Sequence, residues 1–291
     1  MAQAAYRRSG RSRVRRRGLS IGDVAGDMRD AFVEHNLLTY AAAVAFQMIV
    51  ALLPLAVLGL ALLGAFGLGH LWTDTLTPGL RGHLTPPVYR AIASTGERIV
   101  STGLGATIVV AGLLSVWYLT AAVRTVMEAL NKIHDVVDQR PWWTRVLLAL
   151  GLGTAVGIAT VGSFLIVTWG STVSGTGAVV LDIGRWIAAI VLLCLVVALL
   201  VRVAPAEHPA PRWASAGSVL VVVSWIVTTV LFKLWLTNVI DLKTPTGILA
   251  GLLALAVYLF VSASVFLVGV QLDETLRKLT GGRARGILPW F

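Results

Sequence analysis

The sequence predicts an all-α integral membrane protein with six transmembrane helices, and three observations carry this prediction. Hydrophobic residues make up 57% of the 291 residues and charged residues only 13%, against about 25% charged in a soluble domain. Six apolar segments are each long enough to cross a hydrocarbon core, which takes roughly 20 helical residues. Lysine and arginine are concentrated in the segments on one side of these spans.

The chain divides into four predicted parts. Residues 1–20 hold seven arginines and few apolar residues, a composition typical of a disordered basic arm. Residues 21–35 place carboxylates on one side and apolar residues on the other at helical spacing, which predicts an amphipathic interfacial helix. The six-helix transmembrane domain follows at 36–275, and residues 276–291 form a tail.

The first span, 37–69, is the longest and has no charged side chain. As a straight helix it would reach about 50 Å, well beyond a hydrocarbon core of about 30 Å. Pro54 lies near its middle and removes one backbone hydrogen bond. We therefore predict a long helix that is kinked at Pro54, with Gln47, the one amide of the segment, two turns earlier.

Two further features predict helices outside the first span. The double proline Pro86-Pro87, followed by apolar residues at helical spacing, predicts a second amphipathic helix at the opposite surface. The helical period of the second span continues to Ile133, beyond the membrane, and Gly153 with Gly157 lets the third span approach a neighbour closely. The remaining spans are predicted at 103–124, 146–170, 183–203, 216–236 and 247–271.

The distribution of basic residues predicts that both termini face the cytoplasm, because loops rich in lysine and arginine stay on that side. The arginine-rich arm lies on the side of the membrane that holds both chain termini. Tryptophan next to arginine is typical of a membrane interface, and we expect a cytoplasmic interface at Arg124, Arg140, Trp142, Trp143 and Arg145. The opposite side holds only Arg81, Arg90, Arg98, Arg185, Lys233 and Lys243.

Polar residues inside the spans mark the candidate substrate path, because such groups are costly in hydrocarbon and are commonly functional. Lys233 has two interpretations: it extends its ammonium to the outer headgroups, or it binds an anionic headgroup or counter-ion. We assign the candidate path to Gln47, Pro54, Lys233, Tyr258 and Gln271.

A metal-dependent nuclease is the one enzyme class that can be tested against the acidic residues of this sequence. A metal nuclease needs converging carboxylates that hold its ions. We expect the group after the second span and the pair at the end of the last span to meet only by chance, and signatures of serine, cysteine or phosphate-loop enzymes are missing. We therefore predict no enzyme, metal or cofactor. The groups are His134, Asp135, Asp138, Asp273 and Glu274.

Several stretches in order resemble the YihY/BrkB family of bacterial inner-membrane proteins, once labelled ribonuclease BN. They are 41–55, 129–133 with 140–143 and Arg145, Pro205 with 212–213, Gly217 and Trp225, and 247–273. The resemblance implies six helices with cytoplasmic ends, in the bacterial cytoplasmic membrane. It also implies a function labelled variously as ribonuclease, virulence or serum-resistance factor, or transporter. Family members often have an aromatic residue where this chain has Gln47, and glutamate where it has Gln271.

The sequence is compatible with two functions. The first is a transporter or flippase of a lipid-like or anionic amphiphile, which the intramembrane polar residues favour. The second is a non-transporting envelope-assembly or scaffold protein, in which the basic arm contacts a partner. We expect membrane lipids with anionic headgroups at the cytoplasmic face as partners, leave a homo-oligomer open, and expect no nucleic acid.

Overall fold

The computed structural model describes residues 21–82, 84–102, 105–169, 176–206, 216–238, 241 and 243–279. The predicted basic arm and residues 280–291 of the tail lie outside this part. The described residues form nine α-helices and one short π-helix, without a strand. In order they are α2 (Ile21–Glu34), α3 (Leu37–Ala65), η1 (Trp72–Leu76), α4 (Thr77–Arg81), α5 (Pro86–Thr102), α6 (Gly105–Ile133), α7 (Trp142–Trp169), α8 (Thr176–Val203), α9 (Ala216–Asn238) and α10 (Pro245–Leu279).

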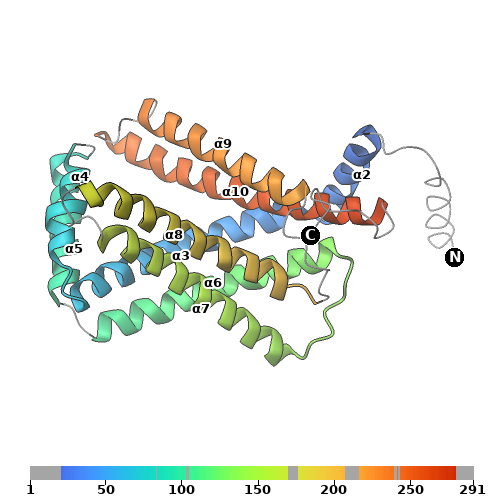
Figure 1. The fold of residues 1–291 in the computed structure, drawn as a ribbon, viewed down its shortest axis with the longest axis horizontal. Helices are drawn as coiled ribbons and strands as arrows, with labels where there is room; N and C mark the ends of the chain where they lie inside the picture. The colour runs from blue at the N-terminus through green and yellow to red at the C-terminus, as the bar shows by residue number, and fades with distance from the viewer. Residues whose placement is uncertain are drawn as a thin grey trace.

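Six of these helices, α3 and α6 to α10, are long and apolar enough to cross a membrane. This confirms the predicted all-helical class and the number of spans. Figure 1 shows the long helices running lengthwise, with α5 across one end of the bundle and α2 at the other. We call the end that carries α2 and the last turns of α10 the α2 end. α3 is central, because it packs against α5, α6, α7 and α10.

The first span is shorter than predicted. α3 begins at Leu37 but ends at Ala65 rather than at residue 69. The cause is Gly67, whose φ of 71° is left-handed and ends the helix as glycine commonly does. α3 continues as one helix through Pro54, which is buried; the kink there stays a prediction.

Two helices extend beyond the hydrophobic segments at the α2 end. α6 continues to Ile133, as its apolar period predicted. α10 continues to Leu279, eight residues beyond the predicted span, so the first four residues of the predicted tail are helical. Good helix formers and a Glu274–Arg277 pair one turn apart favour this extension.

Small residues set the closest helix crossings. A Cβ atom on Gly153 of α7 would lie 2.8 Å from the backbone nitrogen of Thr120 in α6, and one on Gly157 would lie 3.1 Å from a Leu119 methyl group. The expected close approach of the third span is therefore confirmed. α9 meets α10 in the same way, because a Cβ on Gly217 would overlap the carbonyl oxygen of Gly269.

The end of the bundle opposite α2 is covered by α5, the second amphipathic helix that the double proline predicted. Trp72 is buried beneath it, and its Nε1 donates a hydrogen bond to the Ala93 carbonyl at 3.2 Å. Gly96 leaves the room that the indole ring fills. The Trp72 ring is thus covered by α5 and is only 7% exposed.

The α6–α7 crossing yields a matched pair of glycine substitutions. We expect Gly153→Ala to destabilise the protein by about 1–3 kcal/mol, because the added methyl group forces two backbones apart. Gly151→Ala is the control, since nothing lies within 4 Å of a Cβ at that position. Melting in detergent measures both, and equal melting temperatures for the two variants would contradict the crossing.

Candidate functional site at the α2 end of the bundle

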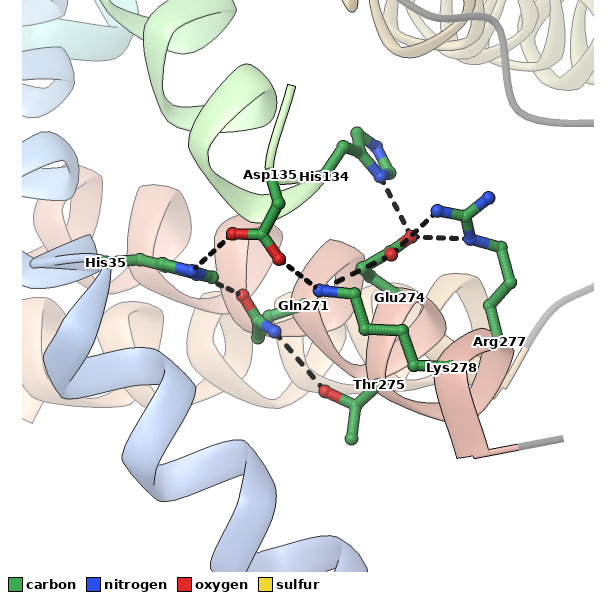
Figure 2. Close-up of polar contacts among 8 residues, drawn as sticks. All are labelled: His35, His134, Asp135, Gln271, Glu274, Thr275, Arg277 and Lys278. Carbon is green, nitrogen blue, oxygen red and sulfur yellow. Dashed lines mark hydrogen bonds and ion pairs between the residues drawn. The ribbon is translucent and has the colours of Figure 1, made fainter. Parts of the chain in front are cut away.

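Three parts of the chain that are distant in sequence meet at the α2 end: the corner between α2 and α3, the end of α6, and the last two turns of α10. Figure 2 shows their polar side chains pointing toward one another. Asn36 and Asp135 both have left-handed φ angles, 52° and 53°, a conformation that Asn and Asp tolerate better than most residues. These two turns end the helices where the side chains converge. We call the eight residues the polar network: His35, His134, Asp135, Gln271, Glu274, Thr275, Arg277 and Lys278.

His35 connects the α2–α3 corner to the other two parts. Its Nδ1 lies 3.0 Å from Oε1 of Gln271, and its Nε2 lies 3.5 Å from a carboxylate oxygen of Asp135. Gln271 is 1% exposed, and its amide nitrogen donates to the hydroxyl of Thr275 at 3.3 Å. With the amide oxygen facing the imidazole, Nδ1 of His35 is the donor.

Glu274 is the most deeply buried charge of the network, with 1% of the residue exposed. His134 Nδ1 lies 3.0 Å from one of its carboxylate oxygens. Arg277 donates one 2.8 Å hydrogen bond to each of the two oxygens. A buried carboxylate is tolerated only when partners of this kind replace its water, so Glu274 depends on both α6 and its own helix.

Asp135 lies at the exposed rim of the network. The ammonium of Lys278 donates a 2.7 Å hydrogen bond to it, and the side chain of Asp135 is 65% exposed. Partial burial raises the pKa of Asp135, but the hydrogen bond and charge of Lys278 outweigh burial and hold the pKa below 3.8. An ion pair this exposed contributes little stability.

These contacts correct one expectation from the sequence. The acidic groups after the second span and at the end of the last span do meet, because α6 and α10 both continue past their apolar segments and end side by side. Asp135, Asp138 and Glu274 face lysine, arginine or histidine, whereas Asp273 accepts a 2.8 Å hydrogen bond from the backbone nitrogen of Gly217. Within the described part of the chain, no group of three or more His, Cys, Asp or Glu side chains is arranged to hold a metal ion. The contacts of the network join the α2–α3 corner, α6 and α10.

The five residues of the predicted path are not joined to one another. No hydrogen bond or ion pair links any two of them in the described residues. Gln271 lies in the polar network, whereas Gln47 accepts a 3.0 Å hydrogen bond from Thr125 of α6. Tyr258 shares a 3.2 Å hydrogen bond with Thr229 of α9. Pro54 is buried and Lys233 is exposed.

Only some residues of the predicted cytoplasmic interface lie together in the structure. Arg140 donates a 2.7 Å hydrogen bond to the Pro205 carbonyl, and Arg145 donates a 3.0 Å hydrogen bond to the Arg140 carbonyl. Trp142 is 73% exposed and Trp143 57%. Arg124 is exposed but lies nine residues before the end of α6, about 14 Å away along the helix.

Sequence reasoning missed His35 as a site residue. It lies on the apolar face of the amphipathic segment 21–35, where it was counted only as part of that face. A histidine that a helix turns toward the core needs polar partners there. That requirement was the available signal, although it did not identify Gln271 and Asp135.

Six apolar helices with a buried polar network at one end define a multi-pass α-helical membrane protein. A family model described as "Virulence factor BrkB" matches residues 28–286 of this chain. The chain belongs to the BrkB family.

Two curated relatives show the same similarity. A UPF0761 membrane protein of Xanthomonas oryzae pv. oryzae (strain PXO99A) is 26% identical over 279 residues, which cover 88% of this chain and 64% of the relative. A UPF0761 membrane protein of Xanthomonas campestris pv. campestris (strain B100) is 26% identical over 257 residues, 84% of this chain and 58% of the relative. The chain thus spans about three fifths of these relatives. No solved structure matches it significantly.

The buried carboxylate gives a stability prediction. We expect Glu274→Gln to lower the free energy of unfolding by about 1–3 kcal/mol, because His134 and Arg277 lose the charge they are paired with. Glu128→Gln is the matched control, since Glu128 is exposed on α6. Thermal unfolding in detergent measures both, and unchanged melting of Glu274→Gln would show that the pairing contributes nothing.

Asp135 gives a prediction on pH. Its folded pKa lies below the ordinary value of 3.8, so its ionised form stabilises the fold above pH 3.8, and this contribution is lost as pH falls below that value. We expect the melting difference between the wild type and Asp135→Asn to be constant above pH 3.8 and to shrink below it. Asp30→Asn, at an exposed position of α2, is the control. A difference that grows on acidification would contradict the assignment.

Proposed function

We propose that this protein moves a lipid-like or anionic amphiphile across the bacterial cytoplasmic membrane, and that the α2 end is its cytoplasmic gate. The carrying observation is the polar network, which closes that end with hydrogen bonds and ion pairs among three parts of the chain. Polar contacts of this kind can be replaced by water, and opening this end would also expose Leu37, Ile133 and Leu267 of the adjacent apolar core. The bundle is covered at its other end by α5.

The membrane-depth hydroxyl groups support an amphiphile over an ion. Ser115, Thr120 and Thr160 each donate to the carbonyl one turn earlier in their own helix. Groups satisfied in this way do not line a hydrated pore, which needs free donors and acceptors. α8 and α9 expose apolar side chains along most of their length, so access from the side, through the lipid, fits the bundle better.

The orientation belongs to the same proposal. An even number of spans returns α10 to the side on which α3 begins, and the polar network places both at the α2 end. The chain has seven arginines among its first 17 residues, directly before α2. The positive-inside rule then favours a cytoplasmic α2 end, with anionic headgroups as its lipid partners.

The scaffold alternative is favoured by one observation. Trp142, Trp143 and Val137, which is 81% exposed, present apolar surface beside Arg145 at the end of the bundle. Exposed tryptophan next to arginine is common in protein interfaces as well as at membrane surfaces. Deleting residues 1–18 separates the two functions, because a scaffold loses its partner whereas a carrier keeps its flux.

Two substitutions test transport directly. We expect Lys233→Ala and Gln47→Leu to reduce the flux of a fluorescent anionic phospholipid in proteoliposomes, because each removes a polar group from a span. Membrane insertion should be unchanged. Lys243→Ala is the matched control, since Lys243 is an exposed lysine in the α9–α10 loop. Wild-type flux in both variants would remove these residues from the path.

A further inference from the structure

The bundle has a hollow of about 310 Å³ on its side, bounded by three helices. It begins at Leu38 in the first turn of α3 and at Leu220 in the second turn of α9, so it lies in the half of the bundle nearest the α2 end. The lining residues are Leu38, Leu220, Ser224, Phe260, Val261, Ser264, Val265 and Val268. We call this hollow the side groove.

The side groove is set by small side chains between two helices that are held together. Ser224 of α9 and Ser264 of α10 both line it, and a larger side chain at either position would fill it. Above it, a Cβ on Gly217 would overlap the backbone of α10. Deeper along the helices, Trp225 donates a 3.0 Å hydrogen bond to the Ser262 carbonyl. The groove is therefore preformed, as ligand sites usually are.

The dimensions of the side groove match one leaflet of a bilayer. Its lining on α10 runs from Phe260 to Val268, about 12 Å at 1.5 Å per residue. Half of a hydrocarbon core is about 15 Å. Six of the eight lining side chains are hydrocarbon, and the hydroxyl of Ser264 is already bonded to the Phe260 carbonyl at 2.8 Å. Such a lining gives water too few polar partners to hold it.

We infer that the side groove binds one acyl chain of a phospholipid from the leaflet on the α2 side. The amphipathic helix α2 packs against α3 and α10 and ends one turn before Leu38, so the headgroup would lie beside α2. Arg29 is the one basic residue of that helix and is exposed, next to the exposed acids Asp30 and Glu34, so the apolar lining and not the charge of α2 selects the ligand. The site goes beyond the proposed transport, because it holds a lipid whether or not the protein moves one.

Photolabelling of the full chain in vesicles tests this site. The probe is phosphatidylglycerol with a diazirine in its acyl chain, diluted in phosphatidylethanolamine and phosphatidylglycerol. We expect severalfold more label on residues 220–224 and 260–268 than on Leu193, Leu195 and Leu199, which are exposed positions of α8 in the half of that helix nearest the α2 end. Equal labelling of the two regions would show ordinary lipid contact and overturn the site.

Substitutions that fill the side groove give a second test of the lipid site. Ser224→Leu and Ser264→Leu, made separately, should each lower the groove label to the level of α8. Val257→Leu, at an exposed position of α10 outside the groove, should leave it unchanged. The wild-type comparison remains decisive if either serine variant fails to fold. Absence of phospholipid flux in wild-type proteoliposomes with the groove label intact would remove the proposed function and leave this site standing.

A second copy of the chain is the competing occupant. Ser224→Cys in a Cys194→Ser background places the one cysteine of the chain in the groove. If an acyl chain fills the groove, short bifunctional thiol reagents should give no dimer in vesicles. Efficient cross-linking between copies at this position would overturn the lipid assignment.

Discussion

The burial of the Glu274 carboxylate is the constraint on which the α2 end depends. A charge that is 1% exposed is stable only if other groups replace its water. Arg277 comes from the next turn of α10, but His134 comes from α6, so both helices must extend beyond their apolar segments. The same extension brings Lys278 to Asp135 and Gln271 to His35. The buried acid thereby accounts for the extension of both helices, whereas Gln271 and Asp135 hold the α2–α3 corner through His35.

The spans could be predicted from the sequence because hydrocarbon imposes a simple requirement: each crossing is a helix of apolar residues. The continuation of α6 to Ile133 was also predicted, since its apolar period persists beyond the membrane. The polar network was not, because contacts between α6 and α10 depend on how each helix is rotated about its axis. The burial of Trp72 depends likewise on α5 folding across it. Local periodicity contains neither kind of information.

The neutral amide of Gln271, in place of a carboxylate, lowers the negative charge of the network. The resemblance to the BrkB family implies a glutamate at this position in other members. With glutamine, His35 donates to a neutral amide oxygen, and no second carboxylate lies one turn before Glu274. Asp273, next to Glu274 in sequence, accepts a hydrogen bond from the backbone nitrogen of Gly217 on α9. Two carboxylates at this spacing on one helix repel each other, and the second would need its own cation. The amide keeps the connection between His35 and α10 without that requirement.

The contacts also define which helices would move together if the α2 end opens under the proposed function. α9 is held to α10 by the Gly217–Gly269 approach and by the Trp225–Ser262 hydrogen bond. α7 is held to α6 by Gly153, and to α8 by the hydrogen bond from Ser163 to the Ala189 carbonyl. The polar network joins α10 to α6 and to the α2–α3 corner, and all of its contacts between these elements are polar. If the apolar core that Leu130, Ile133 and Leu267 share also opens, breaking these contacts separates α9 and α10, as one unit, from α6, α7 and α8. The α3–α10 interface then acts as the hinge, and the side groove lies directly on it.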